Sequence, residues 1–167
     1  AYWALPCLVC LWAYWYGLKA WFLQDDFAWL GLHLSIYNFH DLLDALFVPK
    51  AQGTIRPLSE RAYFLVLQKL FGYDALPFRI VAFATAFADT ALLSALTFRW
   101  TGSRLAGMLA AIFWVVNSSL ASPMSWSSSY NELLCILFLL LSIYLFQRYS
   151  ETADARYYAA QYLTFLL

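Results

Sequence analysis

Two adjacent carboxylates, Asp25 and Asp26, stand directly after the first long apolar run of the chain, which ends at Phe22-Leu23. Adjacent carboxylates push each other's pKa apart, so one can serve as a general base while the other keeps its proton. Their oxygens can also hold a divalent cation, because hard cations prefer oxygen ligands. A structural role is the alternative, since Asp is a favoured N-cap residue and a helix could begin at Phe27. The pair is therefore the first candidate for a catalytic site or a metal site.

A third carboxylate, Asp89, falls near the middle of another apolar run. A charge at the centre of a bilayer costs about 3 kcal/mol on insertion scales, so such a side chain faces a cavity or a partner. Arg79 is ten positions away, which is about 15 Å along a helix and too far for a direct pair. Asp89 is thus a candidate for a functional role or a structural one, and the sequence does not separate the two.

Two histidines form a weaker candidate site. His33 and His40 are seven residues apart and share one face if residues 27–47 form a single helix. With Asp41 and Asp44 they could bind a metal, or ligate a haem or a chlorophyll, because histidine is the commonest metal ligand. The plainer interpretation is a pair of hydrogen-bonded histidines at a membrane surface.

The composition indicates what kind of scaffold must position these residues. Of the 167 residues, 63% are hydrophobic and 12% are charged, against about 25% charged residues in a soluble domain. The mean hydropathy is +0.63, and the net charge of zero argues against a nucleic-acid partner. We expect an all-α integral membrane protein, because backbone groups in lipid must be satisfied within each spanning segment.

Apolar runs predict four to five transmembrane helices, each approaching the roughly 20 residues that a bilayer needs. The chain then divides into a first transmembrane helix over 1–24, an outer loop over 25–75, and transmembrane helices two to five over 76–167. We expect the sequence to be part of a longer membrane protein, since it begins at Ala1 and stops within an apolar run. The predicted helices cover 2–23, about 76–98, about 105–122, about 132–148, and a last one that begins at about Tyr157 and is cut off.

The outer loop is expected to contain two amphipathic helices that lie along the membrane surface. One covers 40–48, and the other covers 56–72, with Pro57 near its start and Gly72 at its end. Pro near an N-terminus and Gly just past a C-terminus are the usual asymmetry of helices. Both segments are too apolar for open water, which favours the interface.

The distribution of arginine predicts the orientation. The loops 99–104 and 148–156 each carry two arginines, whereas 121–132 carries no Lys or Arg. Positively charged loops stay in the cytoplasm. We therefore place 99–104 and 148–156 inside, and 25–75 and 121–132 outside, in a multi-pass protein of the plasma membrane, the inner membrane of a bacterium.

Several short motifs follow one another along these segments. Their ordered set resembles the N-terminal part of the GT-C superfamily of membrane glycosyltransferases. The likeness is greatest to the bacterial protein O-mannosyltransferase-like group and its relatives with tetratricopeptide repeats. It spans nearly the whole chain, although many members have His roughly where this sequence has Asp89. The motifs are Asp25-Asp26, Arg56-Pro57-Leu58, and Pro123, Trp126 and Ser129 followed by Glu132-Leu133-Leu134.

The resemblance implies a polyprenyl-phosphate-sugar-dependent glycosyltransferase, or the N-terminal fragment of one, that acts on the outer face of the membrane. It implies that Asp25 or Asp26, and by preference Asp25, takes the proton of the acceptor, and that Glu132 and Asp89 line the donor cavity. A charge favourable at a helix N-terminus is the alternative for Glu132. Any metal would be a divalent cation held by Asp25 and Asp26.

The implied donor carries a phosphate, which the planar fork of an arginine can bind. Three arginines on the expected outer side are candidates for this role, although each could pair with a lipid headgroup, Glu60 or Asp74 instead. They are Arg56, Arg61 and Arg79.

A different class of function remains open beside the enzyme. The short helix count and the 20% aromatic content also suit a non-catalytic accessory subunit of a larger membrane complex, one that binds pigments or lipids. The expected partners are a lipid-linked sugar donor, membrane lipids and other membrane subunits. A transporter fragment fits less well, because the helices have few internal Gly or Pro breaks.

Overall fold

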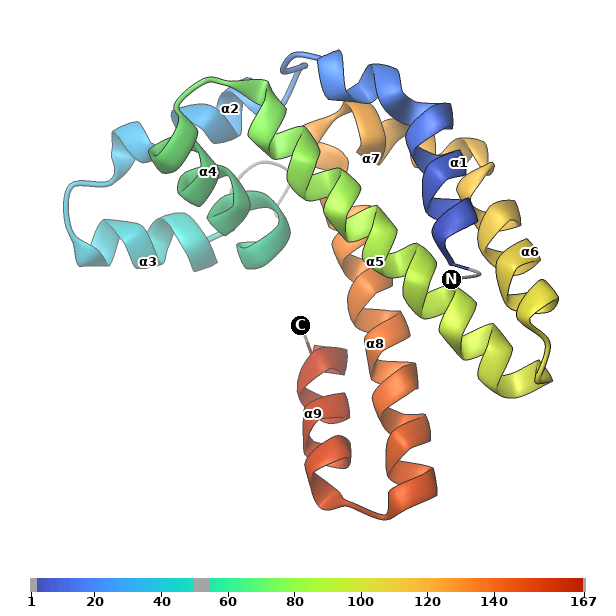
Figure 1. The fold of residues 1–167 in the computed structure, drawn as a ribbon. Coiled ribbons are helices and arrows are strands. Elements are labelled where there is room, and N and C mark those ends of the chain that lie inside the picture. The colour runs from blue at the N-terminus through green and yellow to red at the C-terminus, as the bar shows by residue number, and fades with distance from the viewer. Residues whose placement is uncertain (1–2, 50–54, 167) are drawn as a thin grey trace.

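The computed structural model describes residues 3–49 and 55–166, and in these two ranges the chain forms helices and no strands. Two long helices form its centre (Figure 1). They are α5, Ala75–Thr101, and α8, Tyr130–Thr152. They confirm the helices expected over about 76–98 and 132–148. Among the described residues, Ala75–Thr101 and Ser127–Thr152 are the two helices long and apolar enough to cross a membrane.

A bent pair of helices connects α5 to α8. It consists of α6, Arg104–Val115, and the short α7, Ala121–Ser125. Together the pair passes the same test of length and hydropathy with a bend of 57°, which makes it a candidate for a broken span or a re-entrant loop. The single helix expected over about 105–122 is therefore wrong.

The break after α6 has a local cause and a tertiary one. The Asn117 side chain accepts a hydrogen bond from the Ser119 backbone at 2.9 Å, an alternative to helical bonding that Asn favours. The Tyr14 hydroxyl donates to the carbonyls of Val115, at 2.9 Å, and of Asn117, at 3.0 Å. These carbonyls are thereby satisfied without a continuing helix.

The first apolar run is only partly α-helical. Helix α1, Ala4–Tyr14, continues as a 3-10 helix, Trp15–Lys19. The helix expected over 2–23 is thus interrupted and shorter than predicted. The 3-10 segment packs against α7. At the contact, a Cβ on Gly17 would lie 2.2 Å from the carbonyl oxygen of Met124, so only a glycine allows this approach.

The expected outer segment folds into short helices on the N-terminal side of α5 (Figure 1). Near the predicted 40–48 lies α3, which Asn38 and Asp41 begin with a capping box. The predicted 56–72 becomes a π-helical turn, called η4, followed by α4, which ends at Gly72 with φ +62. The elements are α2 Asp26–Leu30, the 3-10 helix Gly31–Ser35, α3 Phe39–Phe47, η4 Pro57–Ala62 and α4 Tyr63–Phe71.

Aromatic side chains join this segment to the two long helices. The ring of Tyr63 stacks on Tyr130 of α8, with centroids 4.2 Å apart, and meets Phe78 of α5 edge-on at 5.4 Å. Aromatic pairs of this kind contribute about 1 kcal/mol each beyond the area that they bury. The Tyr63 hydroxyl also donates to the Phe78 carbonyl at 2.8 Å, which fixes η4 and α4 against the start of α5.

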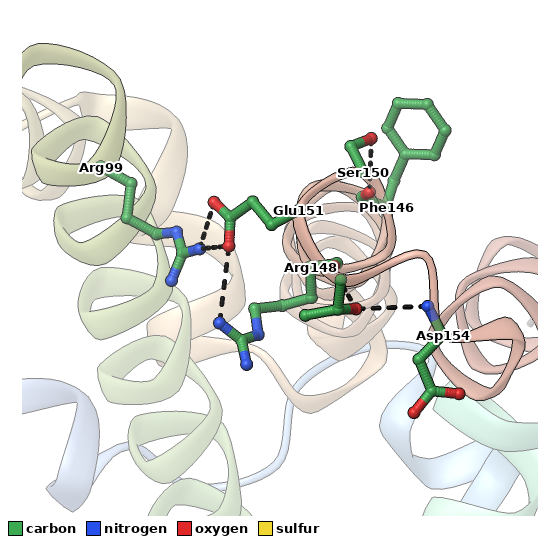
Figure 2. Close-up of polar contacts among 7 residues, drawn as sticks. Arg99, Phe146, Arg148, Ser150, Glu151 and Asp154 are labelled. Atoms are coloured by element: carbon green, nitrogen blue, oxygen red, sulfur yellow. Dashed lines mark hydrogen bonds and ion pairs between the residues drawn. The ribbon is translucent and has the colours of Figure 1, made fainter.

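At the opposite end, an ionic cluster joins α5 to α8 (Figure 2). The Arg99 guanidinium donates to both carboxylate oxygens of Glu151, and Arg148 lies 3.5 Å from one of them. After this cluster the chain turns at Ala153, with φ +54, into α9, Ala155–Leu166, which packs along α8. The loops 99–104 and 148–156, both expected in the cytoplasm, are therefore at one end of the molecule.

Candidate functional site

The two carboxylates of the acidic pair have opposite environments. Asp26 is fully buried, whereas Asp25 is exposed. The backbone N–H of Ser128 donates to Asp26 Oδ1 at 2.7 Å, and the Ser128 hydroxyl donates to the same oxygen at 2.6 Å. The Leu23 N–H donates to Asp26 Oδ2 at 3.0 Å. Asp26 thus joins the end of the first apolar run to the turn before α8. Asp25 precedes α2, but its side chain makes no capping hydrogen bond.

Arg79 lies in the same buried contact region as Asp26. It is fully buried, and its guanidinium donates to the backbone carbonyls of Ala20, at 3.2 Å, and Trp21, at 2.9 Å. Asp26 is close enough to interact electrostatically with it. The pair therefore fixes the segment after α1 against α5, and neither side chain opens to solvent.

Arg61 is also fully buried. Its Nη1 donates to the carbonyls of Ala45 and Val48, at 2.9 and 2.6 Å, and its guanidinium lies 5.9 Å from the centre of the Trp29 ring. These contacts place η4 over the end of α3 and beside α2. Of the three arginines proposed for a phosphate, only Arg56 has an exposed guanidinium.

The buried Glu60 forms a polar group with two exposed charged residues, Arg56 and Asp25. The Arg56 side chain is 43% exposed, and its Nη1 lies 3.8 Å from Oε1 of Glu60, whose side chain is only 6% exposed. Burial raises the pKa of Glu60 above its ordinary value. The cations Arg56 and Arg61 oppose this rise, and the nearby Asp25 carboxylate adds to it.

Glu60 is the residue of this group that the sequence did not indicate as a candidate functional residue. Its spacing of four residues from Arg56 predicts an ion pair on a helix, which is the signal that could have found it. Its burial depends on the helices packed around η4, and no sequence pattern indicates that.

A cavity of about 400 Å³ opens beside this group. Its walls come from η4, from the first half of α8 and from the end of α9. The lining is mostly apolar, with polar atoms contributed by a few side chains that include Arg56, Ser59 and Asn131. Its residues are Ile55, Arg56, Pro57, Leu58, Ser59, Asn131, Leu134, Cys135, Phe138, Leu139, Thr164 and Phe165.

The two residues expected to line a donor cavity are not among those lining residues. Glu132 is exposed on the first turn of α8, next to the lining residue Asn131. Asp89 is fully buried in α5, and neither of its carboxylate oxygens has a hydrogen-bond partner among the described residues. It lies close enough to Tyr130 to interact with it electrostatically.

The two histidines do not share a helical face. The segment 27–47 is broken at Ile36, which has an extended backbone between the 3-10 helix and α3. His33 bonds to the Leu30 carbonyl at 2.7 Å, and His40 lies 3.3 Å from Asp44. In the part of the chain that the structure describes, no three His, Cys, Asp or Glu residues are grouped so as to hold a metal.

This arrangement suits an amphiphile with an anionic head. Arg56 presents a guanidinium at a cavity with apolar walls, and the Asp25 carboxylate is accessible nearby. A guanidinium pairs well with phosphate or carboxylate oxygens, and an exposed carboxylate can accept a proton.

No family model, curated protein or solved structure matches the chain.

Proposed function

We propose that the chain is the N-terminal, donor-binding part of a membrane glycosyltransferase that uses a polyprenyl-phosphate-linked sugar. The observation that carries the proposal is the cavity of about 400 Å³, which combines apolar walls with the Arg56 guanidinium. An isoprenoid chain needs apolar walls, and its phosphate needs a cation at the end of them. Both requirements are met by η4, α8 and α9 together.

The proposal includes a membrane arrangement with four to five spans. α5 and α8 cross the bilayer, the bent α6–α7 pair adds a broken span, and α1 and α9 are the remaining candidates. Two contacts support the grouping of these segments at two ends of the molecule. Asp26 and Ser128 join the two segments expected outside, and Arg99 and Glu151 join the two loops expected in the cytoplasm.

In this arrangement the Arg56 guanidinium pairs with the donor phosphate, and the isoprenoid lies along Leu134, Phe138 and Phe165. Asp25 takes the proton of the acceptor hydroxyl while the hydroxyl oxygen forms a bond to the sugar C1. The bond from C1 to the phosphate oxygen breaks, and the polyprenyl phosphate leaves with the electron pair. Asp26 has a supporting role, because its three hydrogen bonds fix the loop that carries Asp25.

Cys135 allows a direct test of donor binding, because this exposed thiol lines the cavity. In a variant with Cys7 and Cys10 replaced by Ala, a maleimide reports on Cys135 alone. We expect undecaprenyl phosphate in nanodiscs to slow its labelling, and inorganic phosphate to leave the rate unchanged. Arg56→Gln cannot pair with the phosphate, so its affinity for undecaprenyl phosphate should be about tenfold lower, which is equivalent to about 1.4 kcal/mol.

Arg104→Gln is the matched control, since Arg104 is exposed at the other end of the molecule. It should be protected like the parent protein. Equal labelling of Cys135 with and without the lipid phosphate, over a saturating range, would contradict the proposed donor site.

The accessory-subunit alternative is favoured by one observation. Large apolar side chains on α1 and α9 are strongly exposed, including Trp12 at 80% and Phe165 at 67%. Such faces need lipid or partner helices. Co-purification in a fixed ratio with other membrane subunits, together with normal sugar transfer after deletion of the gene, would support this function over the enzyme.

A further inference from the structure

The Glu60 carboxylate is incompletely satisfied within the described structure. It is 4% exposed as a residue, and its Oε2 finds no hydrogen-bond partner among the described residues. Its Oε1 faces Arg56 at 3.8 Å, beyond the length of a strong hydrogen bond. A buried acceptor without a donor is costly, and a buried charge more so. A proton on Glu60 would remove much of that cost.

The charged groups that act on Glu60 come from two elements. Arg56 and Arg61 flank it at η4, and Asp25 lies at the start of α2. Arg61 already donates to two carbonyls of the α3 region. Arg56 is therefore the exposed cation next to Glu60, and it also lines the cavity.

We propose that Glu60 is the positioning residue of the anion site on Arg56, and that it takes up a proton when a lipid phosphate binds there. The inference rests on the proposed function. An incoming phosphate brings a further negative charge to Arg56, beside a Glu60 carboxylate that already interacts with Asp25. Protonation of Glu60 removes one of these charges. The neutral carboxyl keeps a carbonyl oxygen that can still accept from Arg56, so the guanidinium stays at the cavity.

The sign of the linkage follows from this exchange. Since binding takes up a proton, the affinity is highest below the pKa of unliganded Glu60 and falls as the pH rises above it. Burial raises that pKa above its ordinary value, which moves the transition toward neutral pH. Gln at position 60 mimics the protonated form at every pH.

The experiment measures the affinity of the purified protein in nanodiscs for methyl farnesyl phosphate. This phosphodiester carries a single charge that does not titrate between about pH 5 and about pH 8. We expect the affinity of the parent protein to fall by up to about tenfold per pH unit above the transition. Glu60→Gln should bind with an affinity that is independent of pH and equal to that of the parent protein at low pH.

Two further variants complete the test. Asp44→Asn, an exposed carboxylate of α3, is the matched control and should keep the parental pH profile. Glu60→Asp keeps a titratable group but withdraws it from Arg56, so it should keep a pH slope with weaker binding. This variant decides the question if Glu60→Gln fails to fold, as judged by thermal unfolding.

The outcomes separate the two proposals. Binding by the parent protein with no pH slope, or an unchanged slope in Glu60→Gln, would overturn the role of Glu60 and leave the donor site intact. A rise in affinity with Mg²⁺ at fixed pH that Glu60→Gln abolishes would mean that Oε2 takes a cation in place of a proton, and would equally overturn it. No binding of the probe at any pH would overturn both proposals.

Discussion

Asp25 and Asp26 are neighbours in the sequence, but only the second is buried. Successive residues of a helix point about 100° apart, so one side chain at the start of α2 can face the interior while the other faces out. Asp26 uses its two oxygens to accept from Leu23 and Ser128. Two adjacent carboxylates thereby divide into a structural residue and an accessible one.

This division predicts different effects for two isosteric substitutions. Asp26→Asn replaces one acceptor oxygen by an NH₂ that must face a donor, so it should lower the free energy of unfolding by about 2 kcal/mol. Asp25→Asn should change it by less than about 0.5 kcal/mol but abolish the sugar transfer that we propose. Chemical denaturation in detergent and a transfer assay measure the two effects. Normal transfer by Asp25→Asn would exclude Asp25 as the base.

At the scale of elements, the close approach of the 3-10 helix after α1 to α7 depends on one glycine. A Cβ at Gly17 would overlap the Met124 backbone oxygen, at 2.2 Å. Because the clash is with backbone, a whole element must move to relieve it. Met124 lies in α7, shortly before the turn that Asp26 holds through Ser128.

Gly17→Ala should therefore lower the free energy of unfolding by about 2 kcal/mol, the usual cost of overpacking a well-packed contact. Gly31→Ala is the matched control, since nothing lies within 4 Å of a Cβ there and its φ is −76. It should be neutral or slightly stabilising. Thermal unfolding of both variants in the same detergent measures the difference, and equal midpoints would show that α7 yields without cost.

The elements differ in how well the sequence predicts them. α5 and α8 are long apolar runs, and α5 begins and ends with local signals, the Asp74 cap and Gly102 at φ +69, so their existence and approximate bounds follow from local patterns. The end of α6 follows only in part, because it depends on Tyr14, about a hundred positions earlier, as well as on the local hydrogen bond of Asn117. The burial of Arg61 and the place of Glu60 in the candidate site likewise depend on packing between helices. Composition and residue spacing do not indicate that packing.

At the scale of the whole molecule, the contacts made by the charged side chains described above lie at the two ends of the long helices. One end carries the Asp26–Ser128 joint and the cavity group around Arg56. The other carries the Arg99–Glu151 cluster (Figure 2). A bilayer requires this separation, since its apolar centre penalises charge and its two surfaces do not. Asp89, buried between the ends, is the exception in α5.

The two ends should therefore lie on opposite sides of the membrane. Asp44 and Ser150 are exposed residues of the expected outer segment and of an expected cytoplasmic loop. In a background with Cys7, Cys10 and Cys135 replaced by Ala, a membrane-impermeant maleimide added to intact cells with a permeabilised outer membrane should label Asp44→Cys and spare Ser150→Cys. Lysis of the inner membrane should make both reactive. Labelling of Ser150→Cys alone before lysis would invert the orientation, and would place Asp25 and the cavity on the cytoplasmic side. Labelling of both would remove the membrane from between the two ends.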